Sequence, residues 1–339
     1  MKLLDRYIYT KFIAYEAGLL ALFSVLVISS QIMHLPSVFY HIGIFQFIAS
    51  LLLINISFFK LQYFIATTLA FFFTGINLKE TREIIAIKSL GVSKKYLFSL
   101  ILKISLVLVL FSILISFFIV PKANRERAKF ITESVRNYYM ESIQPKNFFK
   151  FPGDTVIYVE NKNKNLFEDV FLFSKRDGRL ITAKKAFIKG GLLILDNGLV
   201  QIPSEKGFSI LKFERYELKL DINYKKDYTY DDFKLKKLIE LTASSNKNER
   251  NKAYSVIFER IGYVIPFLFI GVIAFFIGVG IEKEKEILLG GIILFIISYT
   301  FVNFYLLKLI EKGILNPILY LAIIILIMSV SAIYSYKKG

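Results

Sequence analysis

The 339-residue sequence contains no cysteine and only two histidines, His34 and His41. The absence of cysteine excludes a disulfide framework, a thiolate nucleophile and a cysteine-based metal site. Two histidines are too few for a histidine-rich catalytic cluster. Apolar residues dominate instead: 55% of the chain is hydrophobic, against about 45–50% in an average protein. Because these residues are clustered in runs rather than spread out, the composition excludes a soluble cytoplasmic enzyme.

Six apolar runs are long enough to cross a membrane, which takes about 20 mostly apolar residues. They cover residues 12–33, 45–76, 104–120, 261–281, 287–307 and 314–334. Charges inside them are few, with Glu16 near the start of the first run and Lys60 inside the second. The sequence therefore predicts a polytopic α-helical membrane protein, with three spans before and three spans after a long polar segment.

Basic residues in the short connections predict the orientation of these spans. Both termini and segments 79–103 and 283–285 are rich in Lys, whereas the short connections on the other side contain only Lys308 and Lys312. We therefore expect cytoplasmic termini and a central segment, residues 122–250, on the opposite side. The first run is longer than the roughly 7–15 residues of a signal-peptide core, so we interpret it as a retained anchor.

The central segment begins as a helix and then changes period. Residues 122–139 contain no Gly or Pro, so they are predicted to continue the third helix outward until Pro145. Five short β-branched or aromatic runs follow, at residues 154–160, 170–173, 180–183, 192–195 and 208–224. The turn signals between them are residues 161–165, Asp177-Gly178, Gly190-Gly191 and 196–198. This pattern predicts an inserted all-β domain of six to eight strands, after which residues 231–252 return to the membrane as helix.

The inserted segment carries more Lys and Arg than Asp and Glu. One interpretation is a solvated face that is basic only because the whole chain is rich in Lys. The other is attraction of an anionic or phosphorylated partner by the long-range field. A nucleic-acid partner is not expected, because stacking aromatic residues do not alternate with Arg here.

The connection after the second run contains the most informative pattern of the chain. Residues 79–90 are predicted to form a short helix with its charges at the start and an apolar stripe of Ile84, Ile87 and Leu90. Gly91 suits the left-handed residue that ends this helix, and Ser93 is placed to cap the next one. Such a helix suits a groove on a cytoplasmic partner, and an ordinary interfacial helix is the alternative.

A nucleotide-binding motif does not accompany this helix, because the sequence contains no G-x-x-x-x-G-K-[ST] pattern. If ATP drives the protein, another chain hydrolyses it. We therefore expect no cofactor in this chain, and ATP and Mg²⁺ bound by a partner.

These residues resemble the lipopolysaccharide export permeases of the LptF/LptG type, over nearly the whole chain. Arg82-Glu83 through Ser89-Leu-Gly91-Val-Ser93 is similar to the coupling-helix pattern of that family. Further similar segments are 180–186 and 193–198 in the β-domain, 235–241, Glu259-Arg260, Pro266, Tyr299, Gly313 and Asn316-Pro317.

Three departures from the family are visible. The second span has no proline between Pro36 and Pro121, which leaves open whether it bends. The loop between spans four and five, residues 282–286, alternates Glu and Lys where the family is commonly Arg-rich, and residues 322–327 replace an aromatic and proline ending. Which member of the LptF/LptG pair the chain corresponds to also stays open.

The resemblance implies a non-enzymatic half-permease in the cell inner membrane that pairs with a homologous partner subunit. Residues 1–121 and 251–339 would form the membrane domain, with the coupling helix at about 79–91, and residues 122–250 a periplasmic β-jellyroll-like domain. The pair would take lipopolysaccharide from the outer leaflet, driven by a cytoplasmic LptB-like ATPase dimer. The β-domain would pass the lipid to a bridge of LptC/LptA-like β-jellyroll proteins.

The same resemblance assigns ATPase coupling to the loop. Glu83 would sit in a groove of the ATPase and transmit its closure, together with Arg82, Ile84, Ile87, Gly91 and Ser93. The alternative for Glu83 is a solvated acid at a helix start, favoured there by the helix dipole.

Basic residues are the candidates for lipid binding. Lys60 lies inside a span, where a charge costs about 2.5–3.5 kcal/mol, so it either faces a cavity and binds lipid phosphate or snorkels to the outer surface. Five further residues would ring the cavity mouth or anchor the interface: Lys122, Arg125, Arg127, Lys308 and Lys312. Glu16, Glu259 and Arg260 are interpreted as interfacial or paired structural charges.

Three rival functions stay open. Exporters and mechanotransmitters of the MacB/FtsX type carry the outer domain after their first span and have four spans, which the three-plus-three arrangement disfavours. A membrane-anchored assembly scaffold would bind a partner and move no substrate. An ion-driven carrier would need buried acids at mid-membrane, for which Glu16 is the single candidate.

Overall fold

The computed structural model describes residues 3–34, 43–151, 155–163, 166–175, 177–189, 192–204, 207–219, 229–281 and 284–338. They belong to two compact units. The helical unit comprises Met1–His34, Leu51–Glu126 and Tyr228–Gly339, and the sheet unit comprises Leu35–Ser50 and Arg127–Asp227.

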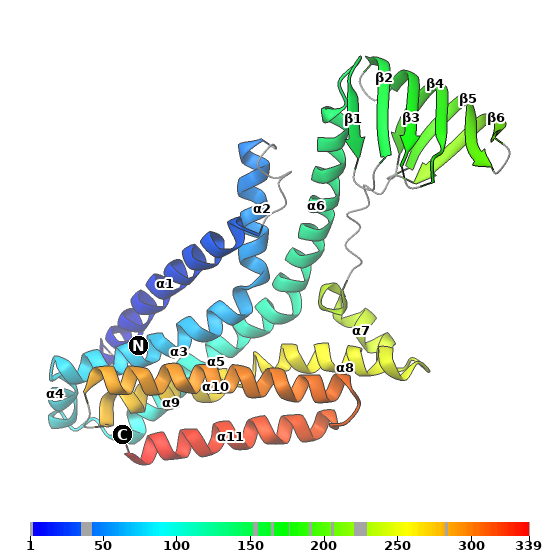
Figure 1. Ribbon diagram of the computed structural model, residues 1–339. Helices are drawn as coiled ribbons and strands as arrows, with labels where there is room; N and C mark the ends of the chain where they lie inside the picture. The colour runs from blue at the N-terminus through cyan, green and yellow to red at the C-terminus, as the bar shows by residue number, and fades with distance from the viewer. Residues whose placement is uncertain are drawn as a thin grey trace. The chain divides into compact units, whose positions relative to one another are not determined.

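The helical unit confirms the six predicted membrane spans (Figure 1). Its helices are α1 (Leu3–Ile32), α3 (Phe59–Glu80), α4 (Glu83–Ser89), α5 (Lys94–Leu114), α7 (Leu235–Thr242), α8 (Lys247–Gly262), α9 (Phe267–Gly280), α10 (Lys285–Glu311) and α11 (Pro317–Lys338). Two more helices cross the boundary between the units: α2 (Ile44–Ser57) and α6 (Val120–Ser142). The helices extend beyond the apolar runs because their polar flanks also favour helix.

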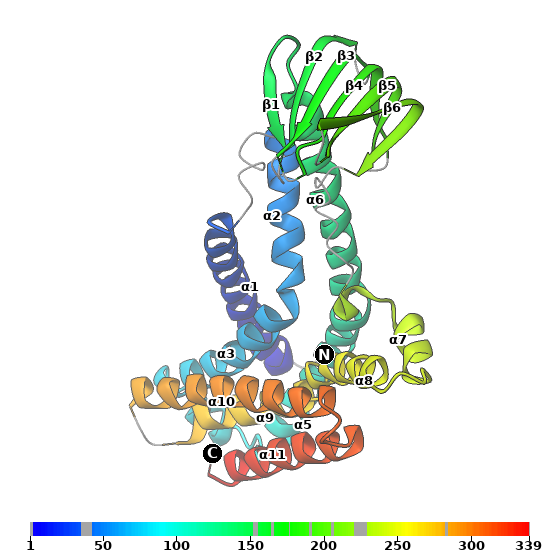
Figure 2. The ribbon, with the colours of Figure 1, turned by 45° about the vertical axis from the view of Figure 1, so that its right-hand side comes forward.

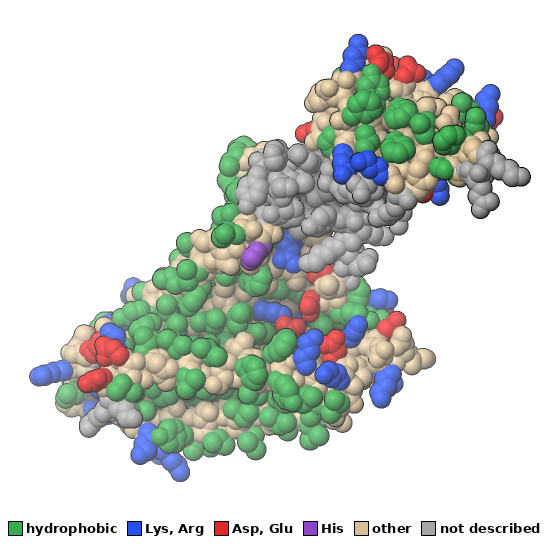
Figure 3. Space-filling view, viewed as in Figure 1, with side chains coloured by type: hydrophobic (Ala, Val, Ile, Leu, Met, Phe, Trp, Pro, Cys, Tyr) green, Lys and Arg blue, Asp and Glu red, His purple; other side chains and the backbone are tan. Residues whose placement is uncertain are grey.

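Apolar side chains cover the middle of the helical unit, and charged side chains gather toward its two ends (Figure 3). The exposed apolar residues include Leu22, Leu110, Leu294 and Leu326. In water this surface would be an aggregation liability. It is the surface expected of helices that face lipid.

The core of the helical unit lies where α3 and α9 cross. Their backbones approach closely at Gly75 and Gly278: a Cβ added at Gly75 would lie 2.5 Å from the carbonyl oxygen of Phe275, and one at Gly278 would lie 2.7 Å from that of Phe72. Small residues permit such close helix packing in a membrane. The helix α9 is central to the bundle, with most of its residues buried.

The predicted second run, residues 45–76, is divided at Phe58 into α2 and α3, and only α3 is long enough to cross a membrane, which corrects the predicted extent of this span. Gln62 Nε2 donates to the side-chain oxygen of Asn55 across the break at 2.9 Å, and Ser57 Oγ donates to the carbonyl of Leu53 at 2.9 Å. Side-chain hydrogen bonds of this kind compete with the helical backbone pattern and bend helices. The break therefore forms without proline.

The third span continues as a helix beyond its apolar run, as predicted, because residues 122–139 lie within α6. A π-helical turn, Ile115–Ile119, joins α5 to α6 just before Pro121. Proline lacks an N–H and its ring crowds the preceding turn. A π turn at this place accommodates both effects without ending the helix.

The short helix α4 begins at Glu83, which corrects the predicted helix over residues 79–90. Lys79 and Glu80 are the last residues of α3. Arg82 has a left-handed backbone, with φ 58°, and this conformation interrupts the helix between Glu80 and Glu83.

The sheet unit contains one antiparallel sheet with the strand order β1-β2-β3-β4-β5-β6, which confirms an all-β insertion with six strands (Figure 2). The strands are β1 (Phe148–Phe151), β2 (Thr155–Asn163), β3 (Leu166–Ser174), β4 (Leu180–Lys189), β5 (Leu192–Ser204) and β6 (Gly207–Lys219). Asp177-Gly178 forms the predicted turn between β3 and β4, where Gly178 has φ 67°. Gly190-Gly191 lies outside the described residues. Of the predicted turn signal at residues 161–165, residues 161–163 belong to β2 and residues 164–165 lie outside the described residues.

The sheet is creased along a line that crosses β2 to β6. The pairing of neighbouring strands skips five positions: Glu160, Asp169, Lys184, Asn197 and Glu214. Asp169 and Asn197 are left-handed, with φ 49° and 56°. Along β3 the buried residues change from odd to even numbers at this line, so both halves of the strand contribute to one core.

The crease corrects the prediction that residues 196–198 form a hairpin turn. These residues lie inside β5. A Cβ added at Gly198 would lie 2.0 Å from the carbonyl oxygen of Thr182 on the neighbouring strand. The Asn-Gly pair therefore bends a strand here, with the same left-handed conformation that would close a hairpin.

Candidate functional site

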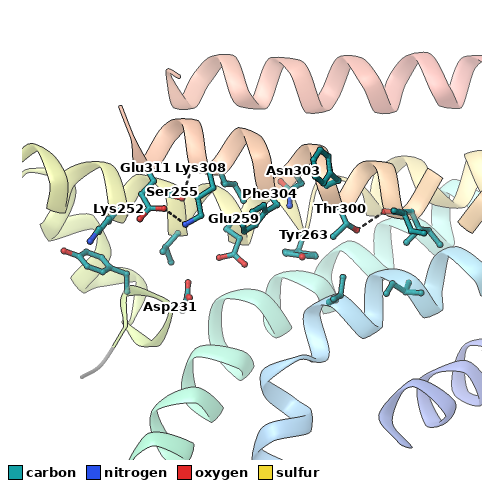
Figure 4. Close-up of a pocket in the computed structure, with 18 residues that line it drawn as sticks. Asp231, Lys252, Ser255, Glu259, Tyr263, Thr300, Asn303, Phe304, Lys308 and Glu311 are labelled. Atoms are coloured by element: carbon teal, nitrogen blue, oxygen red, sulfur yellow. Dashed lines mark hydrogen bonds and ion pairs between the residues drawn. The ribbon is translucent and has the colours of Figure 1, made fainter. Parts of the chain in front are cut away.

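The helical unit contains a pocket of about 830 Å³ between α3, α8 and α10 (Figure 4). Apolar side chains form its inner wall, among them Leu61, Ile65, Ile296 and Phe301. Charged side chains gather near the α7 end: Asp231, Lys252, Glu259, Lys308 and Glu311. A pocket with an apolar wall and a charged rim suits an amphipathic ligand.

The pocket uses one face of each helix. Lys252, Ser255 and Glu259 of α8, and Tyr263 directly after its last residue, recur at the three- and four-residue spacing of a single helical face. Sequence reasoning missed Lys252 as a pocket residue. Its spacing to Glu259 was visible in the sequence, but the helix packed opposite was not.

Lys60 and Glu259 form an ion pair between α3 and α8. The side chains are 20% and 25% exposed, and the Lys60 ammonium lies 5.3 Å from the centre of the Tyr263 ring. Glu259 and Tyr263 line the pocket, so Lys60 lies at its border. The counter-charge of Lys60 comes from this chain, and its role toward lipid phosphate stays a prediction.

Two arginines hold the segment that contributes Tyr230 and Asp231 to the pocket. Arg260, only 2% exposed, donates to the carbonyl oxygens of Asp231 at 3.0 Å and Phe233 at 2.8 Å. Arg125 donates to the carbonyl oxygen of Asp232 at 2.8 Å. Both guanidinium groups therefore position the backbone of this short 3₁₀ turn.

Asp231 is exposed as a residue, but its carboxyl group lies at the pocket rim. Desolvation there, followed by the negative charge of Glu259, raises the pKa of Asp231. The rim thus holds two neighbouring acids beside the ammonium of Lys60.

The other basic candidates are dispersed. Lys308 lines the pocket and pairs with Glu311 at 2.7 Å. Lys312 follows the end of α10, Lys122 is exposed on α6, and Arg127 belongs to the sheet unit. A ring of these residues around one cavity mouth stays a prediction.

The connection between α3 and α5 is held by side chains of α1. The Glu83 carboxylate accepts hydrogen bonds from Tyr7 Oη at 2.7 Å and from Lys11 Nζ at 2.8 and 2.9 Å. Desolvation opposes the charge of Glu83, but the hydrogen bonds from Lys11 and Tyr7 outweigh it and hold the pKa of Glu83 below its ordinary value. The carboxylate is charged, and it is bound within this chain.

The turn after α4 is built as predicted. Gly91 is left-handed, with φ 82°, and Ser93 Oγ accepts from the backbone N–H of Tyr96 at 3.2 Å. The predicted apolar stripe is divided, however. Ile84 and Ile87 are 6% and 7% exposed in the core, whereas Leu90 is 82% exposed.

The sheet unit has its own hollow, of about 1310 Å³, at the crease. Apolar and charged residues line it together, including Phe171, Lys184, Leu199, Phe213 and Glu214. Among the residues that the structure describes, no group of three or more His, Asp or Glu side chains is arranged to hold a metal ion.

Six apolar spans, an inserted antiparallel sheet and a pocket with an apolar wall and a charged rim define a multi-pass membrane protein with room for an amphipathic ligand. The family model of the lipopolysaccharide export system permease LptF/LptG matches residues 6–338. The chain therefore belongs to this family, whose members are permease subunits of a lipopolysaccharide export system in the inner membrane. None of the curated proteins matches the chain.

Proposed function

We propose that this chain is one half of an ATP-driven exporter that takes lipopolysaccharide from the outer leaflet of the inner membrane. The pocket between α3, α8 and α10 is the observation that carries the proposal. Acyl chains would lie against its apolar wall, and lipid phosphates would meet Lys252 and Lys308 at the rim. Lys60 would add a third cation when its pair with Glu259 opens.

The basic bias of the connections supports an orientation with α4 and both termini in the cytoplasm. In that orientation the sheet unit lies in the periplasm. Its hollow at the crease and its edge strand β6, with Phe208 and Ile210 exposed, would serve transfer to a periplasmic bridge of similar β-proteins.

The energy would come from a cytoplasmic ATPase dimer that holds ATP and Mg²⁺, with a homologous permease as the second half. The exposed side of α4 offers Arg82, Ile85 and Leu90 to such a partner. Ile84 and Ile87 would anchor the helix to the bundle instead of contacting the ATPase.

Photo-crosslinking tests the pocket. A photoreactive residue at Phe304, which lines the pocket and is 60% exposed, is expected to capture lipopolysaccharide in intact membranes. The same residue at Tyr305, at the same depth and 56% exposed but outside the pocket lining, is the control. Equal capture at both positions would show that lipid contacts α10 unspecifically and would contradict the pocket assignment.

The basic rim is tested with the double variant Lys252→Gln and Lys308→Gln. We expect capture at Phe304 to decrease about tenfold, because hydrogen bonds to charged groups contribute about 1.5–3 kcal/mol. The double variant Lys236→Gln and Lys237→Gln, at two exposed positions on α7, removes the same two charges and is the control for net charge.

Purification in mild detergent, followed by mass analysis of bound subunits and lipid, tests the assembly. An ATPase, a second permease and glycolipid are expected together. An ATPase without glycolipid would favour a mechanotransmitter, and neither partner nor lipid would favour a scaffold.

A further inference from the structure

Helix α1 is the least buried of the six spans, and polar side chains tie it to α3 at three levels. Ser24 Oγ donates to Gln62 at 3.2 Å, Thr67 Oγ1 donates to Glu16 at 2.7 Å, and Lys11 Nζ donates to Asn77 at 2.8 Å. A weakly packed helix with a few discrete attachments moves more readily than one embedded in the core.

A further attachment of α1 reaches α4. Tyr7, Lys11 and Glu83, which we call the α1–α4 clasp, are joined by three hydrogen bonds of 2.7–2.9 Å. Tyr7 and Lys11 are one helical turn apart, and the Lys11 ammonium lies 4.6 Å from the centre of the Tyr7 ring. One face of α1 therefore holds both oxygens of a carboxylate at the first residue of α4.

The clasp differs from an ordinary surface ion pair. Its Lys11 and Glu83 side chains are 21% and 30% exposed. Lys285 and Glu80, near the same end of the bundle, are 42% and 46% exposed and 3.3 Å apart. Partial burial and charge-assisted hydrogen bonds make the clasp the stronger connection.

The other end of α1 meets the break in the second span. Ser24 bonds the same Gln62 side chain that bridges to Asn55 across Phe58. A displacement of α1 therefore acts on the joint between α2 and α3 as well as on the pocket helix α3.

We propose that the α1–α4 clasp transmits movement of α4 to α1, so that Glu83 acts through Tyr7 and Lys11 of its own chain. Tyr7 and Lys11 are then positioning residues of the transport cycle. This inference rests on the proposed function, because it takes an ATPase as the source of the movement of α4.

Transport assays on the complete complex test the clasp with Lys11→Gln, Glu83→Gln and the charge swap Lys11→Glu with Glu83→Lys. Each neutral variant is expected to release about tenfold less lipopolysaccharide per ATP hydrolysed, while the ATPase still co-purifies. The swap is expected to recover most of the loss. Lys285→Gln, which breaks the exposed ion pair with Glu80, is the matched control and is expected to transport normally.

A defect in Glu83→Gln together with a silent Lys11→Gln would overturn the inference, because Glu83 would then act on the partner directly. Failure of the swap to restore transport would also overturn it, provided that the swapped chain keeps its wild-type melting temperature. If the swap unfolds, Tyr7→Phe replaces it, and an unchanged Tyr7→Phe variant counts against the clasp.

Spin labels separate this inference from the proposed function. Because the chain contains no cysteine, a pair of spin labels can be attached to cysteines introduced at Ile13 on α1 and at Ile85 on α4. Both positions are exposed. A narrow distance distribution is expected in the isolated chain, and a broader one in Lys11→Gln. If no ATPase co-purifies, the proposed function fails while this distance still reports the clasp. An unchanged distribution in Lys11→Gln would overturn the clasp itself.

Discussion

Individual polar residues of the helical unit join helices far apart in sequence. Tyr320 Oη donates to the side-chain oxygen of Asn303 at 2.5 Å, and Ser112 Oγ donates to the carbonyl of Tyr263 at 2.7 Å. Polar groups away from water are costly unless hydrogen-bonded, so each of these pairs favours one helix arrangement over others.

At the residue scale, the contribution of the Glu83 carboxylate to stability can be tested by changing the pH. Its pKa is lowered in the folded chain, so its stabilisation is fully present above the ordinary carboxyl pKa, about 4.3, and is lost as the pH falls through the lowered value. We expect the melting temperature of wild type to exceed that of Glu83→Gln at neutral pH. Below about pH 4 this difference should close.

Thermal unfolding in detergent over a pH series measures the difference, and Glu80→Gln, which removes a more exposed carboxylate, is the control. A gap that shows no dependence on pH below the ordinary carboxyl pKa would assign the effect to side-chain shape rather than to charge.

Local residue roles were predictable, and distant partnerships were not. The sequence places Gly91 and Ser93 within a few residues of the groups they serve, and the structure confirms both. Tyr7 and Glu83 are separated by 76 positions, and only the packing of α1 beside α3 brings them together. The ion pair of Lys60 was missed for the same reason.

At the scale of elements, glycine permits two helices to approach each other closely where they cross. Gly75 and Gly278 let α3 and α9 pack with their backbones in contact. Gly290 and Gly291 of α10 have open space around an added Cβ, so they have no such role in this chain.

We expect Gly278→Ala and Gly75→Ala to lower the free energy of unfolding by about 1–3 kcal/mol each, because the new methyl group overpacks the crossing. Gly290→Ala should be neutral or stabilising by up to about 1 kcal/mol, through helix propensity. Thermal or denaturant unfolding in detergent measures these changes. Equal effects at Gly278 and Gly290 would contradict the close crossing.

The type of each element, helix or strand, could be predicted from the periodicity of apolar residues, whereas the interruptions within elements could not. Six spans emerge from apolar runs, and an all-β insertion of six to eight strands emerges from five short runs between turn signals. Strand β1, Phe148–Phe151, lies outside those runs. The break at Phe58 interrupts a run that looks continuous, and the crease at Asn197 lies where the sequence predicts a hairpin turn. A hydrogen bond from Gln62 accompanies the first, and a neighbouring strand lies beside Gly198 at the second. Propensity does not report such tertiary contacts.

At the scale of the whole molecule, the predicted orientation in the membrane can be measured. The chain contains no cysteine, so a single introduced cysteine reports its own side of the membrane. A membrane-impermeant maleimide is expected to label Phe208→Cys from the periplasmic side, and Leu90→Cys only after permeabilisation. These positions are 70% and 82% exposed. Leu294→Cys, 65% exposed within a span, should resist labelling from both sides because lipid covers it. Labelling of Leu90→Cys in intact cells would reverse the orientation.

The bend at Phe58 has a consequence for how the membrane part works. A pyrrolidine ring would fix a permanent angle, whereas here two amide side chains hold the corner through a contact with a net worth of about 0.5–1.5 kcal/mol. That amount is close to thermal energy, so we expect this hydrogen bond to break and re-form readily. Without proline at this position, the angle between α2 and α3 is held by a contact that can break and re-form.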